Sequence, residues 1–203
     1  MNELNKQLFR DENLSEILDN NKKRAMHAVD EIPESQFLAS TDEQIFIFEL
    51  ESSKFPHLEW FPERKEMSPR DVKVDVSNSP GYIVSESSHP ALVHGFELTF
   101  EIPFQGSFGF WRLRPSEFGG NSPIGSYREG QQSGTGVLEI KYQYPADSMK
   151  PEVVKHELDQ NIQKIDTYLE RIRTDIDAYH KELEPIIRTA IEAEQKMGQE
   201  PNS

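Results

Sequence analysis

The chain has 203 residues, of which 36 are acidic and 22 are basic, so its formal net charge at pH 7 is −14. A negative charge of this size repels phosphate backbones, and direct nucleic-acid binding is therefore not expected. The absence of cysteine excludes disulfide frameworks, thiolate metal sites and cysteine nucleophiles.

The N-terminal sequence MNELNKQLFRDENLSEILDN carries acidic residues where a signal peptide needs a basic start and an apolar core. No window of the chain approaches the roughly 18 consecutive apolar residues of a membrane-spanning helix. We therefore expect a cytoplasmic protein without a membrane partner.

Residues 1–55 are predicted to form an N-terminal helical segment. Apolar residues recur at steps of three and four over residues 3–30, with a break expected at Asn20 and Asn21. Further on, Ser40 and Glu43 have the spacing of a capping box just before an apolar run. The Ile and Phe residues of that run favour a strand, whereas the cap favours a short helix, which is our prediction.

Residues 56–146 are predicted to form a small antiparallel β-domain, because frequent prolines exclude long helices. Apolar and polar residues alternate over 72–76, 96–104 and 138–144, as expected for strands with one buried and one solvated face. After a turn at 105–107 the apolar positions change parity, which predicts a bulge or burial on both faces. Two glycine-rich segments, 119–125 and 130–136, indicate turns or a surface loop.

Residues 147–198 are predicted to form a long C-terminal helix, kinked or reversed in a hairpin at Pro185, with a disordered tail at 199–203. Its apolar residues step alternately by four and three, close to a heptad repeat. This seam comprises Leu158, Ile162, Ile165, Leu169, Ile172, Ile176, Tyr179 and Leu183. The spacing favours self-association or a partner helix, and the alternative is packing within the chain.

A binding site is predicted where arginines accompany aromatic residues in this acidic chain. The candidate residues are Trp111, Arg112, Arg114, Tyr127 and Arg128. Guanidinium groups beside aromatic rings can hold an anion or a partner's carboxylate. The alternative is that the arginines form ordinary pairs with Glu97, Glu101 or Glu117 across the strands.

No catalytic residue, metal site or cofactor is predicted. Glu139 and Lys141 match the Glu-x-Lys half of a nuclease-type metal site, but the aspartate that such a site needs one strand earlier is missing between Val76 and Ala146. His89 and His94 lack a third ligand nearby and are expected to be surface residues.

Several short segments occur in an order that resembles the N-terminal region of a group of uncharacterised bacterial proteins. They are Val29–Pro33, Asp42–Phe55, Val74–Ser77, Ile102–Gly106, Leu113–Ser116 and Leu138–Tyr142. Such proteins often continue, after the long helix, into a restriction-endonuclease-like domain. Because this sequence ends at Ser203, no nuclease residue is carried over to it.

The resemblance implies a sensing, scaffolding or oligomerising module of a defence-type system. Together with the residue patterns, it leads us to expect an α+β protein that acts as a non-catalytic interaction or regulatory module. In that view the β-domain recognises a partner or ligand and the long helix oligomerises or connects to an effector. The alternative is a metal-dependent hydrolase acting on a nucleotide or nucleic acid.

Overall fold

The computed structural model describes residues 5–77, 79 and 90–199 and has the predicted α+β architecture. The chain forms two compact units, each assembled from segments that are distant in the sequence. The first unit contains Met1–Arg10, Leu58–Arg112 and Gly119–Thr167, and the second contains Asp11–His57, Leu113–Phe118 and Tyr168–Ser203.

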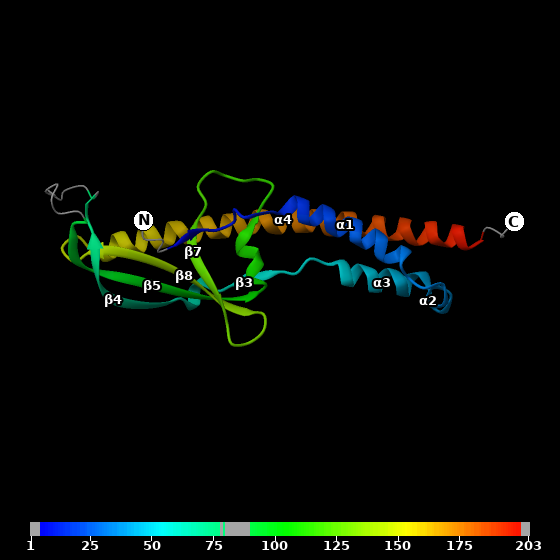
Figure 1. The fold of residues 1–203 in the computed structure, drawn as a ribbon, viewed down its shortest axis with the longest axis horizontal. Coiled ribbons are helices and arrows are strands. Elements are labelled where there is room, and N and C mark those ends of the chain that lie inside the picture. The colour runs from blue at the N-terminus through cyan, green and yellow to red at the C-terminus, as the bar shows by residue number, and fades with distance from the viewer. Residues whose placement is uncertain (1–4, 78, 80–89, 200–203) are drawn as a thin grey trace. The chain divides into compact units, whose positions relative to one another are not determined.

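The first unit is built on an antiparallel sheet (Figure 1). Its strands are β1 (Lys6–Gln7), β3 (Leu58–Trp60), β4 (Glu66–Asp75), β5 (Leu92–Gly106), β7 (Ile124–Glu129) and β8 (Thr135–Pro145). The order β1-β7-β8-β5-β3 places β5 next to β8, and β4 pairs with β5 beside β3. A short 3-10 helix, η1 (Pro62–Arg64), lies between β3 and β4.

The sheet has one apolar and one polar face, which confirms the alternation predicted from the sequence. Along β5 the buried apolar residues are Leu98, Phe100, Ile102 and Phe104. The register pairs Phe100 with Ile140 and Ile102 with Leu138 of β8, so the buried side chains of both strands lie on the same face.

The aromatic stretch after β5 differs from the bulged strand that we predicted. Gly106 turns the chain with a φ of 120°, and residues Phe108–Arg112 form a 3-10 helix, η3. This 3-10 helix causes the change of parity. A helical turn can bury the adjacent residues Phe110 and Trp111 on one side, whereas a strand places adjacent side chains on opposite faces.

Trp111 lies at the centre of an aromatic cluster in the first unit. Its ring centroid is 5.3 Å from that of Phe104, 5.7 Å from that of Phe9 and 6.2 Å from that of Trp60. Phe9 has a φ of 58°, an unfavourable value for a bulky residue, and its side chain is fully buried. Burial of this ring offsets the local strain of the backbone.

The second unit contains α1 (Leu14–Asp30), α2 (Glu34–Ala39), α3 (Asp42–Ser53) and α4 (Pro151–Gln199) from Tyr168 onward. Strand β2 (Glu12–Asn13) pairs in parallel with β6 (Leu113–Arg114). The predicted helix over 3–30 therefore begins later than expected, and its residues 3 and 4 lie outside the described part of the chain. Asn13 caps α1 by accepting a hydrogen bond from the Ser15 backbone, and α1 continues through Asn20 and Asn21.

Helix α3 confirms the helical prediction for the apolar run after Ser40. Its capping box is shifted by one residue, with Thr41 as the N-cap and Gln44 as the reciprocal partner. The hydroxyl of Thr41 accepts from the Gln44 backbone, and the Gln44 side chain accepts from the Thr41 backbone. The cap thus satisfies two backbone donors at the start of the helix.

Helix α4 passes through Pro185 without reversing, so the chain forms no hairpin there. Gln199, the first residue of the predicted tail, is helical, and residues 200–203 lie outside the described part. All residues of the predicted seam are buried within the chain except Ile162, which is half-buried. This burial favours the alternative of packing within the chain.

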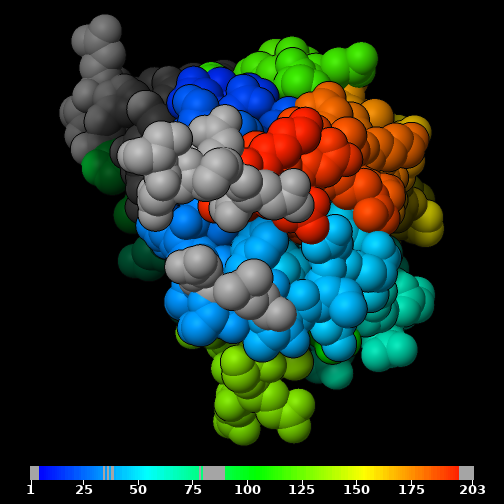
Figure 2. Space-filling model, turned by 90° about the vertical axis from the view of Figure 1, so that its right-hand side faces the viewer, coloured from blue at the N-terminus to red at the C-terminus, as the bar shows by residue number. Residues whose placement is uncertain are grey.

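In the second unit, α4 contacts both α1 and α3; Figure 2 shows α3 and the end of α4 side by side. The hydroxyl of Tyr179 donates to the Ser53 carbonyl over 2.7 Å, and Lys22 forms an ion pair with Glu182. The guanidinium group of Arg188 lies 3.7 Å from the centroid of the Phe46 ring. Polar contacts thus surround the apolar stripe of α4.

His180 joins α4 to the segment that follows α3. Its Nε2 atom accepts a hydrogen bond of 3.0 Å from the Phe55 backbone, so this nitrogen carries no proton. Burial, and then the neighbouring His57, lower the pKa of His180, while Asp177 acts in the opposite direction. The folded state therefore favours the neutral imidazole.

The first prediction concerns the seam. Leu169→Asp and Ile176→Asp should each destabilise the chain by more than about 4 kcal/mol, because they place an unpaired charge in the core. Ala178→Asp, on the exposed side of the same turn, should leave the melting temperature nearly unchanged. Circular dichroism and sedimentation measure both effects. A wild-type dimer that becomes a folded monomer in Ile176→Asp would show that the seam joins two copies.

The second prediction concerns pH. The pKa of His180 is depressed on folding, so its neutral form contributes stability above about pH 6.5, the usual pKa of histidine. This contribution should be lost as the pH falls from there through the folded-state pKa. His180→Gln should flatten the pH dependence of unfolding in urea, whereas His27→Gln, at an exposed site, should not change it. An unaltered profile in His180→Gln would contradict the assignment.

Candidate functional site

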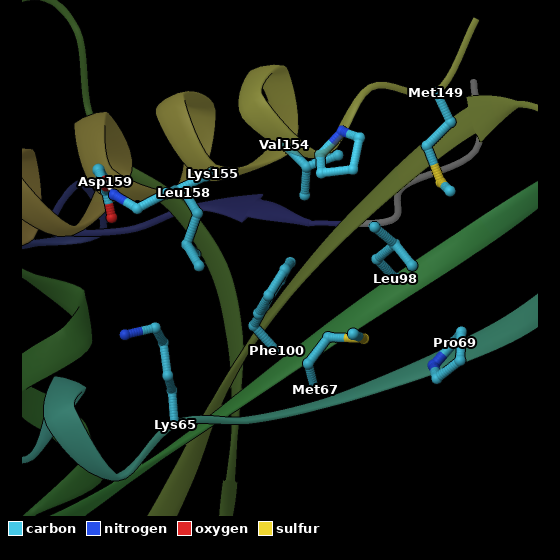
Figure 3. Close-up of a pocket in the computed structure, with 11 residues that line it drawn as sticks. Lys65, Met67, Pro69, Leu98, Phe100, Met149, Val154, Lys155, Leu158 and Asp159 are labelled. Atoms are coloured by element: carbon cyan, nitrogen blue, oxygen red, sulfur yellow. Dashed lines mark hydrogen bonds and ion pairs between the residues drawn. The ribbon is translucent and has the colours of Figure 1, made fainter.

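A groove of about 580 Å³ lies between the sheet and the first turns of α4 (Figure 3). All of its residues belong to the first unit. It is lined by Lys65, Met67, Pro69, Leu98, Phe100, Met149, Pro151, Val154, Lys155, Leu158 and Asp159.

Strand and helix periodicity bring these residues together. Met67 and Pro69 alternate along the start of β4, Lys65 directly precedes the strand, and all three line the same side of the groove. The register places Met67 opposite Phe100 and Pro69 opposite Leu98 of β5. On α4, Val154 and Leu158 are one turn apart and face the sheet.

The groove is apolar along its floor and charged at one end. Leu98, Phe100, Val154 and Leu158 are buried, and Met67 on the wall is 55% exposed. The charged end consists of Lys65 on the strand side and of Lys155 and Asp159 on the helix, at the same end of the groove in Figure 3. This end carries two cations and one carboxylate.

Lys155 and Asp159 form an ion pair one helical turn apart. The hydrogen bond from Lys155 lowers the pKa of Asp159 below its ordinary value, with smaller contributions from Lys65 and His156. The Lys65 ammonium has a long contact of 3.4 Å to the Pro62 carbonyl. Lys65 is thus the cation at this end that forms no ion pair with a described residue, and its ammonium group can donate hydrogen bonds to an anionic group of a ligand.

Side-chain hydrogen bonds hold this part of α4 over the strands. The hydroxyl of Tyr144 donates to the Glu157 carboxylate. The buried side chain of Asn161 accepts from the Ile124 backbone over 3.0 Å and donates to the carbonyl of the same residue over 2.8 Å. Farther along, the Trp60 indole donates to Asp166 over 3.0 Å.

The tyrosines of β8 stay protonated in these contacts. Burial, followed by the nearby Glu157 carboxylate, raises the pKa of Tyr142 to about 12. Burial and the hydrogen bond to Glu157 also raise the pKa of Tyr144. Both hydroxyls therefore remain donors to the helix, Tyr142 to the Glu157 carbonyl over 3.3 Å and Tyr144 to the Glu157 carboxylate.

On the opposite, solvent-facing side of the sheet, Arg128 bridges two glutamates. Its Nε atom lies 2.8 Å from Glu139 and its terminal nitrogen 3.0 Å from Glu101. These hydrogen bonds raise the pKa of Arg128. This is the cross-strand pairing that we considered as the alternative to anion binding.

The carboxylate of Glu139 forms ion pairs with two basic side chains. One oxygen accepts from Arg128 and the other lies 3.0 Å from the Lys141 ammonium. Burial raises the pKa of Glu139, but the bonds from Arg128 and Lys141 more than offset this and leave it below its ordinary value. Among the described residues, no three or more His, Asp or Glu side chains form a group that could hold a metal ion.

The other residues of the predicted binding set have different surroundings within their own units. Trp111 is buried in the aromatic cluster of the first unit. Tyr127 stacks on the exposed ring of Phe108, with a centroid distance of 6.0 Å. Arg112 is half-buried in η3, and Arg114 is an exposed residue of β6 in the second unit. His89, one of the predicted surface histidines, lies outside the described residues.

Sequence reasoning missed the groove. Its walls come from segments more than 75 residues apart, β4 and the start of α4, and no local pattern joins them. The one local signal is the alternation of Lys65, Met67 and Pro69 just before the predicted strand at 72–76.

Comparisons with protein-family models, curated proteins and solved structures gave no match to the chain. The resemblance inferred from short segments therefore remains a prediction. Within the described residues, none of the helices combines the length and the apolar character needed to cross a membrane.

Proposed function

We propose that the chain is a non-catalytic regulatory module whose β-domain binds an amphipathic ligand with an apolar chain and an anionic head. The observation that carries this proposal is the polarity of the groove, which is apolar along its floor and lysine-rich at one end. Its volume of about 580 Å³ lies in the ordinary range for small-molecule sites.

The apolar chain would lie along Phe100, Leu98 and Val154. Each methylene group removed from water there contributes about 0.8 kcal/mol. The flexible side chains of Met67 and Met149 can adjust to chains of different shape, as methionine does in other adaptable sites. The groove therefore supports recognition of a chain rather than of one rigid ring.

The anionic head would lie at the charged end beside Lys65. A carboxylate there would accept a charge-assisted hydrogen bond, which is stronger than a neutral one. Because Lys155 is already paired with Asp159, Lys65 is the main partner that this proposal gives to the head group.

A regulatory role is favoured because such a ligand would contact both β4 and the start of α4. Occupancy would then stabilise the position of the helix over the sheet by mass action. Self-association, an effector linked to α4 and a defence-type setting remain predictions. The hydrolase alternative finds no support at Glu139, whose two oxygens are already occupied by Arg128 and Lys141.

The third prediction tests the ligand class by calorimetry with dodecanoate, dodecanol and dodecyltrimethylammonium below their micelle concentrations. Dodecanoate should bind most tightly. Met67→Glu should reduce the affinity for dodecanoate at least about tenfold, because a carboxylate in the wall of the groove repels the carboxylate and the apolar chain of the ligand. Lys65→Gln should reduce dodecanoate affinity about tenfold, towards that of dodecanol, through loss of the charged hydrogen bond.

Met26→Glu is the matched control, because Met26 is a similarly exposed methionine on α1 (48%) outside the groove. It should leave dodecanoate binding unchanged. The proposal fails if the cationic amphiphile binds as tightly as dodecanoate, or if Met26→Glu and Met67→Glu weaken binding equally.

A further inference from the structure

A second hollow, of about 380 Å³, lies within the second unit between α1 and the end of α3. Its α1 side contains the small residues Ala25 and Ala28, with Asn21 and Arg24 at the same surface. Its α3 side contains Glu49, Ser52 and Ser53. This hollow shares no residue with the groove in the first unit.

Glu49 is the unusual member of this hollow. Its side chain is only 6% exposed, yet no described residue forms a hydrogen bond or ion pair with it. Its carboxylate oxygens are not fully buried and keep access to the hollow, and the surrounding burial raises the pKa of Glu49. Such a group lining a hollow is arranged to receive a hydrogen-bond donor or a cation.

The end of α3 adds to the preference for a cation. Ser52 and Ser53 belong to the last turn of this helix, where backbone carbonyls give a partial negative charge. An ammonium group beside Glu49 would therefore meet both a carboxylate and the negative end of a helix.

The rim of the hollow has the opposite sign. Arg24 is exposed and forms no hydrogen bond or ion pair with any described residue. Lys54 also lines the hollow, although it is paired with Glu51. A purely cationic ligand would be repelled at this rim, whereas a carboxylate would be attracted to Arg24.

We propose that this hollow is a binding site for a small zwitterion of the α-amino-acid class. The ligand's ammonium group lies against Glu49 and the end of α3, and its carboxylate pairs with Arg24 at the rim. The site is independent of the amphiphile groove, and the two proposals can succeed or fail separately.

The fourth prediction is tested by calorimetry of the full chain with each of the twenty standard amino acids, and with butylamine and butyrate. At least one amino acid should bind at about 1 mM or below. Glu49→Gln and Arg24→Gln should each reduce the affinity for that amino acid at least about tenfold. Butylamine should bind more weakly than the amino acid, and butyrate should not bind.

Two controls separate binding from folding. Glu43→Gln, at an exposed acid in the first turn of α3 outside the hollow, should leave the affinity unchanged. Glu49→Gln should keep or raise the melting temperature at neutral pH, because it removes a buried ionisable group that has no partner.

The carboxyl carbon of Glu49, followed by NMR, gives an independent readout. Its pKa should be raised in the ligand-free chain and should fall when the amino acid binds. Absence of binding by all twenty amino acids would overturn the proposal. So would a low ligand-free pKa that rises in Arg24→Gln, because Arg24 would then fill the hollow itself.

Discussion

Helix α4 is held over the sheet of the first unit by polar contacts at fixed points, and the groove depends on them. Tyr144, Asn161 and Trp60 contact the helix or the strand beneath it at successive turns. Asn161 constrains the position of the helix most, because its side chain is buried and forms hydrogen bonds with both the amide and the carbonyl of Ile124. Its loss would leave two backbone groups without partners.

These contacts explain how a helix can cover a sheet and still leave a ligand-sized space. Apolar packing alone has no directional preference and tends to close such a space. The directional bonds of Glu157 and Asn161 fix the helix over β8 and β7. Beside β4, where no such bond is found among the described residues, the wall is formed by Met67 and Pro69 instead.

The periodic parts of this fold could be predicted from the sequence. The alternation of apolar and polar residues over 96–104 predicted the buried face of β5. The spacing of apolar residues by three and four along α4 predicted the buried side of that helix, because both patterns are local. The 3-10 helix at Phe108–Arg112 was missed, since a change of parity fits a bulge as well as a helical turn. The helical prediction that began at residue 3 missed β1 and β2, because these strands have only two residues each.

The candidate sites were harder to predict for a related reason. Arg128 stands out in an acidic sequence, but its partners Glu101 and Glu139 lie on other strands and neutralise it. Glu49 looks like an ordinary solvated residue of a helix until the packing of α1 against α3 buries it. In both cases the tertiary contact, rather than the residue type, determines what the side chain can bind.

Amide hydrogen exchange of Asn161→Leu tests most directly whether polar contacts position α4. We expect the Ile124 amide to exchange roughly 5- to 150-fold faster than in the wild type, while α1 and α3 keep their protection. Unchanged exchange at Ile124 in a folded Asn161→Leu chain would show that apolar packing alone holds the helix and that the Asn161 contacts do not position it.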